Sequence, residues 1–281
     1  MSRNQNADIA ADTLKRLETG AYIAPSGLER DLSTQLEIAK SGTVFYEPHA
    51  LESLQFEAKN LETLLEVTPE STLEAARRVA ADGSRPALLN FASAKDPGGG
   101  FLGGAQAQEE SLARSSGLYP CLLKAPGFYS FHRSQHDLRY SNCMIYSPDV
   151  PFFKDDDGAT LETPYFASVI TSAAPNYGAM GQTQVHDLPS VPSVLLERAG
   201  LVLRLAAHRG HTKLILGAWG CGVFRNPSQL VASSFKQLLQ VGGAFAGVFE
   251  EVSFAVYDRS KDGATLGAFR VAFSDQRSRR G

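Results

Sequence analysis

A short apolar run, a cluster of glycines and a helix-forming segment follow one another in the middle of this chain. Residues 87–91, ALLNF, are preceded by a proline and are typical of a buried strand in an α/β sheet. Glycine lacks a Cβ, so a glycine-rich backbone can take positive φ and approach another molecule closely. From Ala105 onward the residues favour a helix. The glycines of the cluster are Gly98, Gly99, Gly100, Gly103 and Gly104.

The loop and helix carry groups that suit a phosphate-bearing substrate. Main-chain N–H groups in a glycine loop and at a helix N-terminus can bind phosphate. A carboxylic acid a few residues further on can transfer protons. Gln108, Glu109 and Glu110 fall in the first turns of the predicted helix. These features favour a substrate that is cleaved beside its phosphates, while a purely structural strand-to-helix connection stays open as an alternative.

The loop also contains the dinucleotide-binding pattern G-x-G-x-x-G at residues 98–103. In that pattern the first glycine lies close to the end of the strand, whereas residues 92–97 intervene here. The pattern also needs an acidic residue about 20 positions further on, and residues 118–124 offer none. The sequence therefore argues against a nicotinamide enzyme, and no cofactor is expected.

With its flanking residues, the loop resembles the signature of the bacterial-type poly(ADP-ribose) glycohydrolases, a branch of the macrodomain fold. Three glycines, seven further residues and QEE are preceded by NFASAKDP and followed by SLARSSGLY. The likeness continues in SPDVPFF at 147–153, VITSAAPN at 169–176 and LGAWGCGVF at 216–224. It covers most of residues 40–260 and implies a three-layer α/β/α macrodomain with a mixed central sheet. An N-terminal helical extension is expected over residues 1–42, where apolar residues recur at helical spacing.

The resemblance implies a hydrolase that cleaves ribose–ribose O-glycosidic bonds of poly(ADP-ribose), releases ADP-ribose and belongs to the DNA damage response. Glu110, the second Glu of QEE, would be the general acid/base, and Glu109 would position a ribose hydroxyl. Neighbouring helical residues project about 100° apart, so these two cannot flank one bond as most glycosidase carboxyl pairs do. The implied substrate-binding residues are Ala92, Ser93, Gly98, Gly99, Gly100, Gln108, Asn176, Gly220, Cys221, Gly222, Val223 and Phe224.

Two other functions stay open at this stage. The chain could be a reader module that binds ADP-ribose without turnover, or a hydrolase of mono-ADP-ribosylated proteins. A polymer-cleavage assay beside a titration with free ADP-ribose separates a reader from an enzyme. The comparison of release from polymer with release from singly modified protein separates the two hydrolases.

A second glycine loop follows another apolar strand, predicted at residues 213–217. Residues 217–224 contain three glycines and precede a helix that Asn226 and Pro227 are expected to cap. Neither loop ends in the G-K-[ST] of a P-loop, so magnesium-dependent triphosphate chemistry is not supported. Two opposed glycine loops would suit a diphosphate between them.

Composition restricts the partners. The 281 residues, 43% of them hydrophobic, are enough for one elaborated domain, predicted over residues 1–281. A net charge of −3 argues against binding a long polyanion or nucleic acid by counterion release, so recognition of one or two ADP-ribose units is expected. The basic residues Arg277, Arg279 and Arg280 are expected to form a solvated tail.

Cysteine usage and hydropathy bear on where the protein acts. Three widely spaced cysteines without a C-x-x-C pair fit a reducing compartment. No apolar stretch of 18 residues and no signal-like start is seen, so a cytoplasmic protein without a membrane partner is expected. A monomer is expected as well. The pair His132 and His136 lacks the glutamate of H-E-x-x-H, and Asp155 to Gly158 lacks the calcium-loop spacing. No metal is predicted.

The remaining elements follow from periodicity and caps. A helix through Ile9 and Leu17 should end at Gly20, and Thr68 and Pro69 should start another that reaches Ala81. A loop-rich stretch is expected between Pro120 and Asn142. Further helices are predicted at 27–40 and 191–209, and strands at 43–46, 63–67, 142–146, 167–171 and 251–257.

Overall fold

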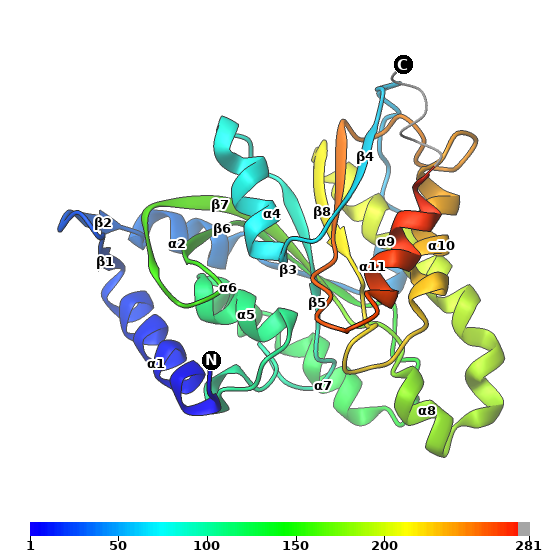
Figure 1. Cartoon of the computed structure of the whole chain (residues 1–281), viewed down its shortest axis with the longest axis horizontal. Coiled ribbons are helices and arrows are strands. Elements are labelled where there is room, and N and C mark those ends of the chain that lie inside the picture. The colour runs from blue at the N-terminus through cyan, green and yellow to red at the C-terminus, as the bar shows by residue number, and fades with distance from the viewer. Residues whose placement is uncertain (275–281) are drawn as a thin grey trace. The chain divides into compact units, whose positions relative to one another are not determined.

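The structure is a computed structural model that describes residues 1–274 (Figure 1). It contains two compact units. The first combines Met1–Tyr46, Ala76–Gln135 and Cys143–Ser172; the second combines Glu47–Ala75, His136–Asn142 and the described residues from Ala173 on. The single domain expected over the whole chain stays a prediction, and the basic tail at Arg277, Arg279 and Arg280 lies outside the described residues.

The first unit is built on a mixed sheet in the order β3-β6-β7-β5. The pairs β3–β6 and β6–β7 are antiparallel, whereas β5 and β7 are parallel, with Asn90 opposite Thr171. The first four residues of β5 and residues 167–172 of β7 are buried, and the apolar runs of the two strands lie in these stretches. The strands are β3 (Val44–Tyr46), β5 (Ala87–Phe91), β6 (Met144–Lys154) and β7 (Thr160–Ser172).

The strands β6 and β7 form one long hairpin. They were expected as two short strands at 142–146 and 167–171, and that prediction is wrong in length, because the two strands extend through prolines and polar residues and pair up to the turn. The turn lies at Asp155–Gly158, where the Asp155 carboxylate accepts the N–H groups of Asp157 and Ala159. The prediction of a turn at this acidic run is therefore confirmed.

The helix α1 (Arg3–Thr19) starts with a capping box between Ser2 and Gln5 and ends at Gly20, as predicted. The helix expected at 27–40 begins only at Ser33, because Glu29–Asp31 (β2) pairs with Ala21–Ile23 (β1). The prediction of a loop-rich stretch between Pro120 and Asn142 is wrong in part. Residues Pro126–Ser134 form α7 and bury the aromatic ring of Phe128. The other helices of this unit are η1 (Ala80–Asp82), η2 (Phe101–Gly103), α2 (Ser33–Ser41), α5 (Gln108–Ser115) and α6 (Leu118–Leu122).

The second unit contains three parallel strands in the order β8-β9-β4. The strand β9 ends at Ala255, two residues before the predicted end. The helix α9 matches its prediction, and α10 packs against both α9 and α11 (Figure 1). The elements are β4 (Leu64–Thr68), β8 (Lys213–Gly217), β9 (Glu251–Ala255), α3 (Pro48–Glu52), α8 (Tyr177–Thr183), η3 (Val185–Ser190), α9 (Val191–His208), α10 (Ser228–Leu239) and α11 (Ala264–Ala272).

The cap predicted at Thr68 is wrong, because this residue is the last of β4. The helix α4 (Thr72–Val79) is capped instead by Ser71. The Ser71 hydroxyl accepts the N–H of Glu74, and the Glu74 carboxylate accepts the N–H of Ser71, which completes a capping box.

None of the helices in the described part of the chain combines the length and apolar character needed to cross a bilayer.

Candidate active site

The first glycine loop connects β5 to α5 within the first unit. The helix begins at Gln108 and not at Ala105, because Gly104 takes a φ of 75° and Ala107 is extended. Gln108, Glu109 and Glu110 are thus its first three residues, which confirms their predicted place in the first turn.

Gln108 ties the start of α5 to the carboxyl end of β5. Its Nε2 donates to the carbonyl of Leu89 at 2.8 Å, and its Oε1 accepts the N–H of Phe91 at 2.8 Å. An amide offers a donor and an acceptor from one side chain, as these two main-chain groups require. Gln108, expected to bind substrate, therefore also positions the two glutamates that follow it.

Glu109 is a buried carboxyl, 2% exposed, that organises the start of the loop. One oxygen accepts the N–H of Ser93 at 2.6 Å, and the other accepts from the Asn90 side chain at 3.2 Å. The Asn90 amide also donates to the Thr171 hydroxyl at 3.1 Å and is fully buried. Sequence reasoning missed Asn90, although a polar residue inside the apolar run ALLNF was the available signal.

Burial raises the pKa of Glu109 to about 8. The hydrogen bonds from Ser93, Asn90 and Gly98 oppose this shift, and the nearby charge of Glu110 adds to it. The neutral form of Glu109 therefore predominates at pH 7. In that form Glu109 places little negative charge next to Glu110.

We expect the free energy of unfolding to fall as the pH rises from about 5 to 8. The folded protein holds a proton on Glu109 up to a pKa of about 8, whereas the unfolded chain releases it near 4.5, so the folded state binds more protons in this window. The slope from this group is at most about 1.4 kcal/mol per pH unit. Urea unfolding of the wild type and of Glu109→Gln at several pH values measures it. An equal slope in both proteins would contradict the assignment.

Glu110 lies against the glycine loop and is partly exposed. Its Oε1 accepts the N–H of Gly100 at 3.0 Å. A Cβ on Gly99, whose φ is 59°, would lie 2.3 Å from the same oxygen. The glycines therefore let the loop approach the chain's own carboxylates, a role that the sequence did not reveal.

The second glycine loop joins β8 to α10 in the second unit. Gly220 has a φ of 71°, and a Cβ there would lie 2.5 Å from that of Ala174. The buried Asn226 donates to the carbonyls of Pro175 at 2.7 Å and Gly220 at 3.1 Å. Asn226 therefore holds the loop in place, and it does not cap the helix as predicted, because α10 begins only at Ser228 and Pro227 is its N-cap residue. Val223 at the tip is 77% exposed.

The segment His136–Asn142 lies beside this loop in the same unit. Asn176, predicted to bind substrate, caps α8 by accepting the N–H of Ala179, and its own N–H donates to the carbonyl of Leu138 at 2.8 Å. Tyr140 has a φ of 57°, which is rare for a bulky residue. Its ring centroid lies 5.8 Å from that of Phe224. Tyr140 is therefore a further candidate for substrate binding. The sequence did not indicate it, because Tyr140 and Phe224 meet only in the folded chain.

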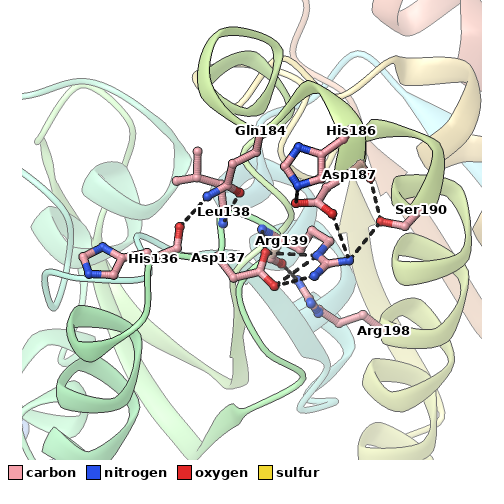
Figure 2. A network of polar contacts seen from close by, with 9 residues as sticks. All are labelled: His136, Asp137, Leu138, Arg139, Gln184, His186, Asp187, Ser190 and Arg198. Carbon is pink, nitrogen blue, oxygen red and sulfur yellow. Dashed lines mark hydrogen bonds and ion pairs between the residues drawn. The ribbon is translucent and has the colours of Figure 1, made fainter.

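Figure 2 shows what holds this segment. The Arg139 guanidinium pairs with Asp137 at 2.7 Å and lies 3.7 Å from Asp187. Gln184 accepts the N–H of Leu138 at 2.9 Å and donates to the carbonyl of His136 at 2.6 Å. Arg198, 1% exposed, donates to the carbonyl of Arg139 at 2.9 Å. These contacts fix the backbone on both sides of Tyr140.

The described residues contain no group of three or more His, Cys, Asp or Glu side chains placed to hold a metal ion. His132 is buried in α7, where its Nδ1 donates to the carbonyl of Phe128 at 2.8 Å. The thiol of Cys221 is partly buried, which raises its pKa to about 12 and suits a neutral side chain.

The chain is similar to proteins of one known family. A family model described as the microbial-type poly(ADP-ribose) glycohydrolase catalytic domain matches residues 10–155. No match was found among curated proteins.

Solved structures of two bacterial enzymes resemble the chain closely. The Thermomonospora curvata poly(ADP-ribose) glycohydrolase bound to the inhibitor ADP-HPD is 47% identical, with 96% of this chain and 100% of that chain covered and a TM-score of 0.90. The Deinococcus radiodurans poly(ADP-ribose) glycohydrolase in complex with ADP-ribose is 47% identical, with 85% and 97% covered and a TM-score of 0.81. These likenesses confirm the predicted α/β fold of macrodomain type. The chain therefore belongs to the microbial-type poly(ADP-ribose) glycohydrolases.

Proposed function

We propose that Glu110 is the general acid/base with which this glycohydrolase cleaves the ribose–ribose O-glycosidic bonds of poly(ADP-ribose) and releases ADP-ribose. The observation that carries the proposal is the different placement of two adjacent carboxyls. Glu109 is buried under three donors, while Glu110 is partly exposed at the surface of the glycine loop. Of the two, only Glu110 is accessible to a substrate.

The proposed reaction uses one carboxyl twice. Protonated Glu110 donates its proton to the ribose oxygen that leaves, and the C–O bond breaks to give an oxocarbenium ion. The substrate's own diphosphate helps to stabilise this cation. The Glu110 carboxylate then takes a proton from water, and the resulting oxygen adds to the anomeric carbon. The net change is hydrolysis of one glycosidic bond, with Glu110 returned to its acid form.

We propose that main-chain groups of both glycine loops contact the substrate. In the second loop, no hydrogen bond among the described residues uses the N–H of Gly222, Val223 or Phe224, so these groups are available to phosphate oxygens. The full proposed binding set is Ala92, Ser93, Gly98, Gly99, Gly100, Gln108, Asn176, Gly220, Cys221, Gly222, Val223 and Phe224.

Phe224→Ala is expected to weaken ADP-ribose binding about tenfold, because an aromatic ring against a ribose or base contributes on the order of 1–3 kcal/mol. Calorimetric titration with free ADP-ribose measures the change. Val241→Ala removes an exposed apolar side chain of the same unit and should leave the affinity unchanged. Equal affinity in wild type and Phe224→Ala would remove this residue from the binding set.

One experiment separates the proposed activity from the alternatives. The purified protein is incubated with poly(ADP-ribose) and, separately, with a mono-ADP-ribosylated protein, and free ADP-ribose is quantified. Release from the polymer with little release from the singly modified protein supports the proposal. Release only from the singly modified protein would assign a different hydrolase, and binding without release from either would assign a reader.

We further propose that the enzyme acts as a monomer in the cytoplasm, without direct binding to nucleic acid or membranes, and degrades polymer made in the DNA damage response. The three cysteines are free, which fits a reducing compartment. The net charge of −3 does not favour a nucleic-acid partner. The molar mass of the purified protein, measured by light scattering, tests whether it is a monomer.

A further inference from the structure

The N-terminal helix α1 reaches the catalytic loop of the first unit. The Arg3 Nε donates to the carbonyl of Gly103 at 2.8 Å. A Cβ on Gly104, whose φ is 75°, would lie 1.9 Å from the carbonyl oxygen of Arg3. Gly104 is therefore a glycine because the first turn of α1 lies directly against it.

Asn6, one turn further along α1, holds the next part of the loop. It is 2% exposed, and its Nδ2 donates to the Gln106 side-chain oxygen at 2.8 Å and to the carbonyl of Gly104 at 3.3 Å. The buried Arg114 of α5 donates to the same Gln106 oxygen at 2.9 Å and to the carbonyl of Ala105 at 2.6 Å. Every residue from Gly103 to Gln106 is thus bound through a carbonyl or side-chain oxygen.

The helix itself is firmly docked on the first unit. Ala10 packs with Phe101 and Ala113 in one buried apolar cluster. The Thr13 hydroxyl donates to the carbonyl of Arg114, and Lys154 of β6, 1% exposed, donates to the Thr13 hydroxyl at 2.7 Å. A helix held by buried groups along its length can impose its position on the loop that it touches.

We propose that Arg3 and Asn6 are positioning residues for the glycosidase reaction. The segment Gly103–Gln106 connects the three glycines to QEE, so its path sets where the Glu110 carboxyl lies relative to the Gly100 N–H. Residues some 100 positions earlier in the chain therefore determine the geometry of the acid. This inference rests on the proposed role of Glu110.

The test compares three variants in steady-state polymer hydrolysis. The double variant Arg3→Ala, Asn6→Ala should lower kcat about tenfold with KM changed less than about twofold, because misplacing a catalytic group affects the chemical step more than binding. Ser2→Ala breaks the capping box of the same helix without touching the loop, so it should lower the thermal unfolding temperature and leave kcat unchanged. Arg3→Lys keeps a donor and should keep most of the activity.

Two results would overturn the inference. One is a kcat within about twofold of wild type in the double variant, and the other is an equal loss of kcat in Ser2→Ala. A thermal melt of each variant, with assays run well below its unfolding temperature, ensures that folded protein is compared. Glu110→Gln is assayed in parallel. Full activity in that variant would refute the proposed acid, while full activity in the double variant alone would refute only the positioning role.

Discussion

Glu110→Gln is expected to lower kcat on poly(ADP-ribose) by about 10²–10⁴-fold, the range attributed to general acid–base catalysis. Glutamine has nearly the shape of glutamate, and its side-chain oxygen can still accept the N–H of Gly100. It cannot donate a proton to a leaving oxygen at neutral pH. Affinity for free ADP-ribose should therefore stay within about threefold of wild type, and the loss should fall on the chemical step.

A single-turnover polymer assay and a titration with ADP-ribose measure the two quantities on the same preparation. Glu37→Gln changes an exposed carboxyl that is paired with Lys40 on α2, and it should retain full activity. If Glu110→Gln turned over polymer at a rate close to wild type, the acid would have to be another group. If it lost ADP-ribose binding and activity together, the role of Glu110 would lie in binding.

Gly99→Ala is expected to lower kcat about 100-fold, the second largest effect. The added Cβ would lie 2.3 Å from one Glu110 oxygen and 3.3 Å from a Glu109 oxygen, so the carboxylates must move away from the loop. A displacement of about 1 Å in a catalytic group can cost a factor of this size. Polymer hydrolysis by the folded variant measures the effect, with circular dichroism as the check on folding.

Gly83→Ala provides the matched control. Gly83 belongs to the same unit and has a φ of 86°, but a Cβ there meets nothing within 4 Å. Both substitutions introduce a side chain at positive φ, and only Gly99→Ala crowds the carboxylates. Equal loss of activity in the two variants would mean that backbone strain, and not displacement of Glu110, causes the effect.

Much of the fold could be predicted because the signals are local. The strand Ala87–Phe91, the helix ending at Gly20 and the helix Val191–His208 follow from apolar periodicity and capping residues. The β6–β7 hairpin could not be recognised, because its strands pair over long stretches that contain prolines and polar residues. The helix α7 was missed because its glycine and serines suggested a loop, whereas tertiary burial of Phe128 and His132 stabilises it.

The candidate site shows a similar division. The order of the glycines and QEE in the sequence was enough to place Glu109 and Glu110 in the first turn of a helix. It could not show that Glu109 is buried under Ser93, since that depends on how the loop folds back on the helix. The contacts of Arg3 and Asn6 with the loop were equally hidden, because residues about 100 positions apart meet only in the folded chain.

The position of the Glu110 side chain relative to a bound sugar tests the central claim most directly. A crystal structure of Glu110→Gln with ADP-ribose would give the distance from the substituted side chain to the anomeric oxygen of the terminal ribose. We predict a separation within hydrogen-bond reach, about 2.6–3.2 Å directly or through one water. A side chain turned away from the sugar, or a nucleotide bound at another surface, would contradict the assignment of Glu110 as the acid.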